Sequence, residues 1–439
     1  MSTKHPQATT RRGFLRAGLT ASLAAPFIPV RNLFAAAPQK AAAKAVIQIW
    51  MWGGPCHLDT FDPKPAAGSD YCGPLNAPIA TAVDGVRIGQ LLPQLARQAK
   101  SFSLIRSMTH GINAHETASY VVQTGHKPGD GQVYPAVGAV VALKKAAANR
   151  TGLIPPYIAL TKPLGRFSEA GFLGSRFKPY ATGGDPNAKV FAAEGIVTEG
   201  ISRERQERRR TLLAQLDTLG NARPSPLFDA MTASREQAYE LILGEPGKVF
   251  DLTLEKDAVR DRYGRNTFGQ SCLAARRLIE QGVVYVSINY PGWDTHKQHF
   301  SLMNRKLPEF DTGLSALLED LTQRGLLDAT ILWCGGEFGR TPKVQWDAPW
   351  NGGRGHYGKA FSALIAGGGF SGGQVVGATD ARGEEVEKDP VYPTDLISAI
   401  YGRLGFSATD TLPHPQGLNI PLVPARDASA GPNPLNAIS

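Results

Sequence analysis

Four short apolar runs, each followed by a turn that contains glycine, constrain the fold of this chain more than any other feature. They cover residues 45–52 (AVIQIWMW), 283–289 (VVYVSIN), 329–334 (ATILWC) and 361–366 (FSALIA). Continuous apolar runs of this length are typical of strands that are buried on both faces of a sheet. The chain is therefore expected to build its core around a covered sheet.

Amphipathic segments between these runs predict the helices that cover the sheet. Helical patterns span residues 271–281 and 307–324, each just before an apolar run, and a further helix is expected over 392–404, where a Pro-Thr-Asp start signal stands. Helices that alternate with buried strands indicate an α/β fold. We predict an α/β/α sandwich with a mostly parallel central sheet.

Residues 146–250 interrupt this alternation. A stretch rich in proline and glycine is followed by a charged helical pattern over 202–216 (SRERQERRRTLLAQL) and another helix over 229–243. We interpret the segment as a mainly helical insertion or cap within a single domain of residues 38–439. The arginines of the charged run form either an anion-binding patch or a solvated helix face, and we favour the second because Glu204 and Glu207 are mixed in.

The basic charge of the chain is concentrated at its start. The formal net charge is +9, but the first 37 residues hold five basic residues and no acidic one, and the rest hold 42 basic and 38 acidic residues, a charge of +4. The sequence TRRGFLR, a short apolar stretch over 17–28 and three alanines ending at Ala37 are typical of a twin-arginine signal peptide over residues 1–37. We expect cleavage after Ala37 and export by the twin-arginine machinery to the bacterial periplasm or cell surface.

Composition excludes several other classes of protein. No later run approaches the about 20 apolar residues of a membrane span, so no stable membrane insertion is expected after cleavage. The small remaining charge and the lack of a recognition motif argue against a nucleic-acid partner. Four cysteines without CxxC spacing are too few for a disulfide scaffold, and a Cys56–Cys72 bridge stays open.

Polar residues after the predicted strands are the candidates for function, because ligands of open parallel sheets bind beyond the carboxyl ends of the strands. Asp294 and His296 are two residues apart, so both side chains point the same way in an extended segment and suit a divalent metal. A hydrogen-bonded pair or a solvated loop is the alternative. Glu337 and His356 are expected at neighbouring strand ends, and Asp59 is either a further ligand or a loop cap.

Other candidates at the same edge suit different chemistry. Arg340 and Arg354 carry guanidinium groups that match a tetrahedral oxyanion such as phosphate or sulfate. His110 and His115 flank the start of a helix predicted over 107–123, where they are either functional or simply cap and pack. Cys56 follows a glycine turn and is either a nucleophile or a small buried thiol.

Five segments in this order resemble the DUF1501 family of exported bacterial proteins over about residues 47–405. They read GGPCHLDTFDPKP, NAHETASYVVQTG, RYGRNTFGQSCLAARRLIEQGVVYVSINYPGWDTH, GEFGRTPK and AGGGFSGGQVVGATD. The family is grouped with the alkaline phosphatase/sulfatase superfamily. The resemblance implies an alkaline phosphatase-like core whose strand ends hold one or two divalent metals, with Asp294, His296 and His356 at one metal and Glu337 at the other.

Three departures from the superfamily pattern bear on the reaction. The hydroxyl or formylglycine nucleophile is expected nine residues before the Thr of a Thr-Gly pair, and counting back from Thr124 reaches His115. His115 then acts as a nucleophile, binds metal, or marks a site that has lost catalysis. The sulfatase Cys-x-Pro-x-Arg motif is absent, and Gly355 stands where many relatives have Asp.

These observations predict an exported, metal-dependent hydrolase of phosphate or sulfate esters of a small molecule or glycan. The cofactor is a divalent ion: zinc, manganese, calcium or magnesium. The predicted metal ligands are Asp294, His296, Glu337, His356 and Asp59, and the predicted catalytic residues are His115, Arg340 and Arg354. The alternative is a non-catalytic exported binding protein that keeps the hydrolase fold.

Overall fold

The predicted strands lie at the centre of a larger sheet in the computed structural model, which describes residues 43–145, 154–162, 169–189, 191, 202–216 and 226–439. Within these residues the sheet has eight strands in the order β12-β4-β11-β8-β1-β7-β5-β6. They are Val375–Val376 (β12), Phe102–Met108 (β4), Phe361–Ala366 (β11), Thr330–Gly335 (β8), Ala45–Trp50 (β1), Tyr285–Asn289 (β7), Tyr157–Leu160 (β5) and Tyr180–Ala181 (β6).

Strand direction confirms the mostly parallel sheet. β1 pairs in parallel with β7 and β8, and β5 pairs in parallel with β6 and β7. β11 runs antiparallel to both of its neighbours, β4 and β8. The amino end of β11 therefore lies at the edge of the sheet where β1, β4, β7 and β8 have their carboxyl ends.

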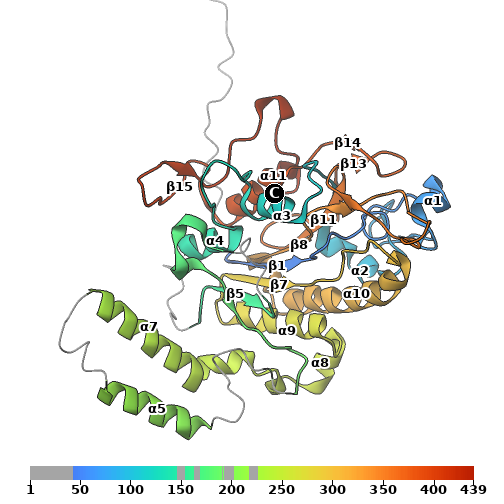
Figure 1. Cartoon of the computed structure of the whole chain (residues 1–439). Coiled ribbons are helices and arrows are strands. Elements are labelled where there is room, and N and C mark those ends of the chain that lie inside the picture. Colours follow the sequence, from blue (N-terminus) through green and yellow to red (C-terminus); the bar gives the residue numbers. More distant parts are fainter. Residues whose placement is uncertain (1–42, 146–153, 163–168, 190, 192–201, 217–225) are drawn as a thin grey trace, which may run out of the picture. The chain divides into compact units, whose positions relative to one another are not determined.

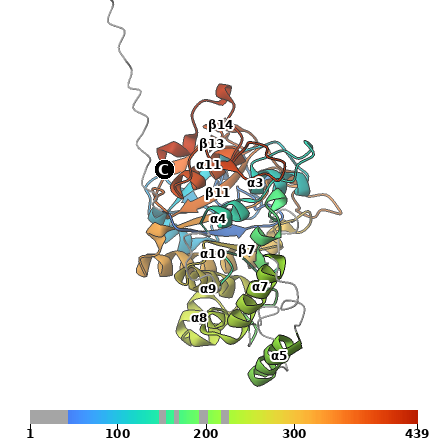
Figure 2. The ribbon, with the colours of Figure 1, turned by 90° about the vertical axis from the view of Figure 1, so that its left-hand side faces the viewer.

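Helices cover both faces of the sheet, which confirms the α/β/α sandwich (Figures 1 and 2). Along β1, Ile47 and Ile49 join the core beneath α2, α9 and α10, whereas Val46 and Trp50 join the core beneath α3, α4 and α11. This division follows from the alternation of side chains along a strand. The helices are Ser69–Cys72 (α1), Pro93–Arg97 (α2), His115–Thr124 (α3), Val137–Lys145 (α4), Arg203–Leu216 (α5), Pro226–Leu243 (α7), Asp257–Tyr263 (α8), Thr267–Glu280 (α9), His299–Gln323 (α10) and Pro393–Arg403 (α11).

The segment over residues 146–250 is less of an insertion than predicted. It contributes β5 and β6 to the central sheet, where β5 continues the parallel pairing of β7. The helical part that the structure describes consists of α5 and α7. The prediction is therefore corrected: the first part of the segment belongs to the sheet, because its short apolar run YIAL is buried there.

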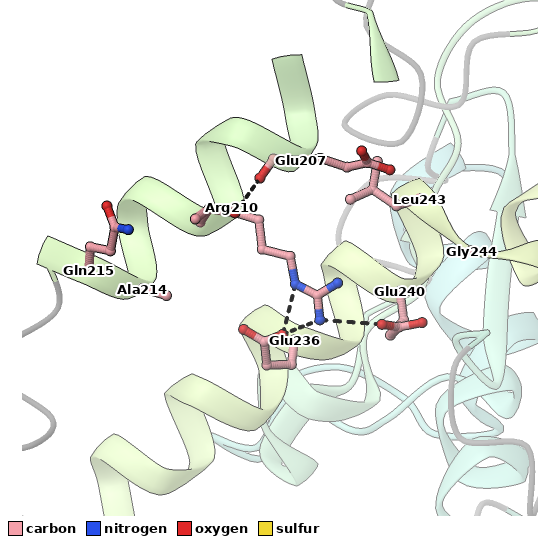
Figure 3. A pocket seen from close by; sticks show the side chains of 9 residues that line it. Glu207, Arg210, Ala214, Gln215, Glu236, Glu240, Leu243 and Gly244 are labelled. Atoms are coloured by element: carbon pink, nitrogen blue, oxygen red, sulfur yellow. Dashed lines mark hydrogen bonds and ion pairs between the residues drawn. The ribbon is translucent and has the colours of Figure 1, made fainter. Parts of the chain in front are cut away.

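The charged helix α5 pairs with α7 through one arginine. Arg210 lies 2.6 Å from Glu236 and 3.3 Å from Glu240 of α7, and Figure 3 shows its guanidinium reaching across from α5 to these two carboxylates. Arg208 and Arg209 are exposed. This arrangement fits the favoured interpretation of a solvated helix face.

One further prediction differs from the structure, and one open question is answered by it. The helix expected over 107–123 begins only at His115, because residues Phe102–Met108 form β4. All four cysteines lie in the described part of the chain and are buried and free, so Cys56 and Cys72 form no bridge. The predicted signal peptide, residues 1–37, lies outside the described residues. Among the described residues, no helix combines the length and apolar character that a transmembrane span needs.

Candidate metal centre

Polar side chains from four separate segments meet at one edge of the sheet. His115 begins α3 after β4, Asp294 and His296 follow β7, and Glu337 follows β8. His356 belongs to the two-residue strand His356–Tyr357 (β10), which precedes β11 and pairs with Gly339–Arg340 (β9). Because β11 is antiparallel to its neighbours, the residues before it reach the same edge as the residues that follow the other strands.

Asp294 lies at the centre of this group. Its Oδ2 atom is 3.4 Å from His115 Nε2, and its Oδ1 atom is 3.2 Å from His356 Nε2 and 3.1 Å from His296 Nε2. The Nε2 atoms of His296 and His356 are 2.8 Å apart. We call His115, Asp294, His296 and His356 the strand-end cluster. The side chain of Asp294 is 40% exposed, so the cluster is open to small molecules.

Hydrogen bonds on the outer side of two rings fix their tautomers. His115 Nδ1 lies 2.6 Å from Glu337 Oε1, and His356 Nδ1 lies 2.8 Å from the carbonyl oxygen of Asn113. Both partners accept, so both Nδ1 atoms donate. In the neutral rings the Nε2 lone pairs of His115 and His356 then face the Asp294 carboxylate. A positive charge is needed between each Nε2 atom and the carboxylate, either as a proton on Nε2 or as a bound metal ion, and this orientation is the one that histidine ligands have in metal sites.

Glu337 hydrogen-bonds to His115 of the cluster and does not itself contact Asp294. The side chain is fully buried, and Oε1 accepts hydrogen bonds from His115 and from the backbone N–H of Gly53 at 2.9 Å. Oε2 is buried and has no hydrogen-bond partner among the described residues. The predicted role as a direct ligand is replaced here by positioning of His115. The unsatisfied oxygen adds to the preference of this region for a cation.

Gly53 allows the end of β1 to approach Asp294 closely. Its φ of +107° lies in the region that favours glycine, and a Cβ atom there would lie 2.2 Å from the backbone nitrogen of Asp294. Alanine at this position would push the Asp294 loop away from β1. The glycine turn after the first apolar run thus shapes the site directly.

Local charges set the protonation of the cluster. Burial raises the pKa of Asp294, but the charge and hydrogen bond of Arg340 outweigh it and hold the pKa below its usual value. For His296, burial lowers the pKa and outweighs the opposing charge of Asp294. Burial also lowers the pKa of His115, yet the hydrogen bond and charge of Glu337 reverse this and raise it. An ionised carboxylate beside a neutral imidazole is the protonation state that metal coordination requires.

Arg340 positions Asp294 instead of binding an oxyanion as predicted. The guanidinium is fully buried and contacts Asp294 Oδ1. Its Nε donates to the carbonyl oxygen of Gly53 at 2.9 Å, and Nη1 donates to that of Arg354 at 3.2 Å. Because backbone carbonyls and a carboxylate occupy its donors, Arg340 has little capacity left for a substrate.

Asp59 and Arg354 lie in a second, buried group and do not join the strand-end cluster. Asp59 Oδ2 is 2.6 Å from His299 Nε2 and 3.4 Å from Arg354 Nε. Arg354 also donates to the backbone carbonyls of Thr341 and Tyr71, at 2.9 and 2.6 Å. The structure therefore corrects two predictions: Asp59 pairs with buried His299 and Arg354 rather than joining Asp294, and Arg354 anchors loops rather than contacting an oxyanion.

Three other candidates are now placed. His299 was missed by the sequence reasoning, although it starts α10 and its Nδ1 lies 2.6 Å from Thr295 Oγ1. Cys56 is buried, which raises the pKa of its thiol and removes the basis for a nucleophilic thiolate. His110 packs: its Nδ1 accepts from the N–H of Ile112, and its Nε2 lies 2.7 Å from the carbonyl oxygen of Glu337.

Aromatic rings enclose the histidines, and no sequence signal used above identified them. Trp52 stacks on His115 with ring centroids 5.3 Å apart and an interplanar angle of 22°. Phe338 stacks on His356 at 4.7 Å and 26°. These rings restrict the imidazoles to few orientations, so the cluster is preorganised. Their positions next to predicted strand ends are the signal that was available.

The family model for DUF1501, described as a protein of unknown function, matches residues 43–429. The chain belongs to the DUF1501 family. No curated protein matches it.

Several solved structures resemble this DUF1501 protein at low identity. The lipoteichoic acid synthase LtaP from Listeria monocytogenes has a TM-score of 0.41 and 9% identity, covering 90% of this chain and 76% of LtaP. The C-terminal periplasmic domain of EcEptC from Escherichia coli, in complex with Zn, has a TM-score of 0.36 and 8% identity, covering 86% and 88%. The PsFucS1 sulfatase from Pseudoalteromonas sp. has a TM-score of 0.33 and 12% identity, covering 83% and 68%.

The dimensions of the cluster in this DUF1501 protein fit a metal ion. Donor atoms about 2.1 Å from a tetrahedral zinc ion are about 3.4 Å from one another. The four separations within the cluster run from 2.8 to 3.4 Å. Ligand atoms of His115, Asp294 and His356 all lie within 4.8 Å of one another. The predicted ligands Asp294, His296 and His356 are thus brought together, and His115 joins them.

Proposed function

We propose that this protein is an exported hydrolase of phosphate or sulfate esters that depends on a divalent metal. The observation that carries the proposal is the convergence of three imidazoles and one carboxylate, with the Nε2 atoms of His115 and His356 directed at Asp294. Nitrogen-rich donor sets suit zinc or manganese better than magnesium or calcium, which favour oxygen.

The residues around the cluster hold its donors in place. Glu337 keeps His115 Nε2 directed inward, the Asn113 carbonyl does the same for His356, and Arg340 fixes Asp294. A bound divalent ion would supply Lewis acidity at an ester oxygen and a more acidic water. Hydrolysis then adds one water across the ester and releases an alcohol and an inorganic oxyanion.

His115 is better placed as a ligand than as a nucleophile. Its Nδ1 is held by Glu337 and its Nε2 faces Asp294, so neither nitrogen is free to attack an ester. As a ligand, His115 would act on the reaction by holding the ion, and the role of acid or base would fall to another group. With histidine at the place where the superfamily carries a hydroxyl, water is the nucleophile that this site favours.

The second candidate function is a binding protein that keeps the hydrolase fold. Two observations favour it: the histidine at position 115, and Gly355, which leaves no carboxylate beside Thr341, whose Cγ2 atom would lie 3.3 Å from an added Cβ. Such a protein would hold metal and an anionic ester without turnover.

Metal analysis of the purified protein is the primary test. We expect about one zinc or manganese ion per chain, lost in Asp294→Asn and His356→Gln and kept in Glu385→Gln, which removes an exposed carboxylate paired with Lys359. A chain that binds no divalent ion after reconstitution would disprove the metal-dependent proposal. A panel of phosphate and sulfate esters separates the two candidates: turnover that requires Asp294 rejects the binding protein.

Export is tested independently in cells. The full chain is expected in the periplasmic fraction, and Arg11→Lys/Arg12→Lys is expected to retain it in the cytoplasm. Equal distribution of both forms would contradict export by the twin-arginine route and leave the metal site unaffected.

A further inference from the structure

Two exposed tryptophans lie on the loop between β9 and β10, which leads to His356. Trp346 is 47% exposed and Trp350 is 37% exposed. Tryptophan is highly buried on average, so two such side chains on one loop indicate a surface that meets a partner. The ring centroid of Trp350 lies 6.3 Å from that of His296 in the strand-end cluster.

The backbone holds this loop in a defined conformation. Gln345 and Gly353 form an antiparallel bridge in which the N–H of Gln345 donates to the carbonyl of Gly353 at 2.9 Å. The carbonyl of Trp350 accepts from the N–H of Gln298, two residues after His296, at 3.2 Å. The tryptophans are therefore presented on fixed backbone beside the cluster.

Two neighbours, Phe300 and Gly352, cover part of the Trp346 side chain. Its ring stacks on Phe300 with centroids 5.6 Å apart and an interplanar angle of 19°. Gly352 lies on the ring as well, since a Cβ atom there would be 3.1 Å from Cζ3. Trp346 is still 47% exposed beside these neighbours, so its indole presents apolar surface to solvent. Exposed indole surface can bind the flat side of a ligand.

We propose that Trp346 and Trp350 form a sugar-binding platform, so that the ester substrate of the neighbouring cluster is a glycan ester. The claim that the substrate is an ester rests on the hydrolase function proposed above, whereas the claim that the protein binds sugar does not. A pyranose ring has a face lined with C–H groups and a rim of hydroxyls. The negative face of an indole attracts such C–H groups, and burying the two faces together removes apolar area from water.

Polar neighbours on the same loop complete the platform. Gln345, Asp347 and Asn351 are exposed. Their amides and carboxylate offer both donors and acceptors to sugar hydroxyls. The carboxylate of Asp347 would repel the phosphates of a nucleic acid. A lipid chain is bound by aliphatic side chains, and the apolar side chains offered here are two indoles. A sugar ring is the ligand that matches both the flat faces and the mixed polar rim.

The test is saccharide binding by the purified protein. A glycan array that carries neutral, sulfated and phosphorylated saccharides identifies the best binder, whose affinity is then measured by calorimetry. Trp350→Ala and Trp346→Ala are each expected to weaken binding at least about tenfold, a loss of about 1.4 kcal/mol. Trp350→Phe keeps a flat ring and is expected to stay within about threefold of the parent. Leu254→Ala, which trims another exposed apolar side chain, is expected to change nothing.

Several outcomes would overturn the platform. These are no binding to any saccharide, equal binding by the Trp346→Ala/Trp350→Ala variant, or stronger binding of nucleoside monophosphates than of sugars. Melting temperature and metal content verify that the tryptophan variants remain folded, and quenching of tryptophan fluorescence in the parent by the same saccharide gives an independent measure.

One variant separates this proposal from the hydrolase function. Asp294→Asn is expected to lose the metal and retain saccharide binding, because the indole faces do not depend on the cluster. If the parent protein binds saccharide but metal analysis finds no bound ion after reconstitution, the hydrolase proposal is refuted and the platform proposal stands. Metal-dependent ester turnover without saccharide binding would do the reverse.

Discussion

The Nε2 atoms of His296 and His356 lie 2.8 Å apart, although 60 residues separate them in the chain. His356 donates its Nδ1 proton to the Asn113 carbonyl, so its Nε2 carries a lone pair. A second lone pair at this distance would repel it. The contact therefore needs either an Nε2–H of His296 that donates to His356 or a cation between the two rings, and a bound ion would take the place of that proton.

Metal removal is therefore expected to destabilise the protein. A ligand at 100 times its dissociation constant stabilises the folded state by about 2.7 kcal/mol. Thermal melting should show a lower melting temperature with EDTA than without it, which corresponds to a loss of stability of this order. Excess zinc or manganese should restore the melting temperature. The variant Asp294→Asn should melt at the same temperature in both buffers. A parent protein that is indifferent to EDTA and to added metal would contradict the prediction.

Glu337→Gln is expected to weaken metal binding about 10- to 100-fold, because the residue orients His115 and adds negative charge behind it. The amide keeps the shape of the side chain, so the fold should persist. Competition with a chromophoric chelator measures the affinity. Glu385→Gln serves as the matched control on an exposed carboxylate. Equal affinities in all three proteins would show that Glu337 does not position a ligand.

Asp59→Asn is expected to cost about 3 to 5 kcal/mol of the free energy of unfolding, because it removes the charge that balances buried Arg354 and binds His299. Urea denaturation measures this loss. Metal content should stay at the parent level, since Asp59 lies in a separate buried group. Loss of metal with unchanged stability would instead support the prediction from the sequence that Asp59 is a metal ligand.

Stability is expected to fall as pH drops from about 6.5 to about 4 because of His126. Burial lowers the pKa of His126 to about 4, although Asp130 opposes this. The ring stacks on Tyr134 at 3.5 Å, and its buried Nε2 has no hydrogen-bond partner among the described residues. The unfolded chain binds a proton near pH 6.5 and the folded chain does not, so protonation favours unfolding.

The effect reaches at most about 3 kcal/mol at the acid end of this window. The free energy of unfolding of the parent and of His126→Phe, which keeps the stack, should be compared at pH 7 and pH 5 in the presence of EDTA, so that metal release does not contribute. The parent should lose more stability than the variant. Identical losses would mean that His126 is protonated in the folded state.

The sequence predicted those strands that are apolar on both faces. β1, β7, β8 and β11 are continuous apolar runs because both of their faces meet helices. β4 was missed because it contains Ser103 and Ser107, which are buried yet satisfied by the carbonyls of Ser371 and Asp389. Such partners come from distant loops, and no local pattern reveals them.

The sequence predicted which side chains lie close together in those cases where position along a strand decides it. Asp294, His296 and His356 converge because strand ends share one edge, a rule that needs no side-chain detail. The arginines show where the rule stops. Whether a guanidinium faces solvent or a backbone carbonyl depends on loop conformation, and Arg340 and Arg354 both turn inward. The exposure of Trp346 and Trp350 was not predicted, because the sequence alone does not show whether an apolar side chain in a loop is buried or exposed.

The donors of the cluster come from α3, from the loop after β7 and from β10, which are far apart in the chain. A cation held by all of them would act as a cross-link that closes long loops, and such links reduce the entropy of the unfolded chain. A fragment that lacks any one of these segments would lose the multidentate grip. Metal affinity would then depend on all of these segments remaining together in one chain. Cleavage within a surface loop far from the cluster would therefore lower the metal affinity.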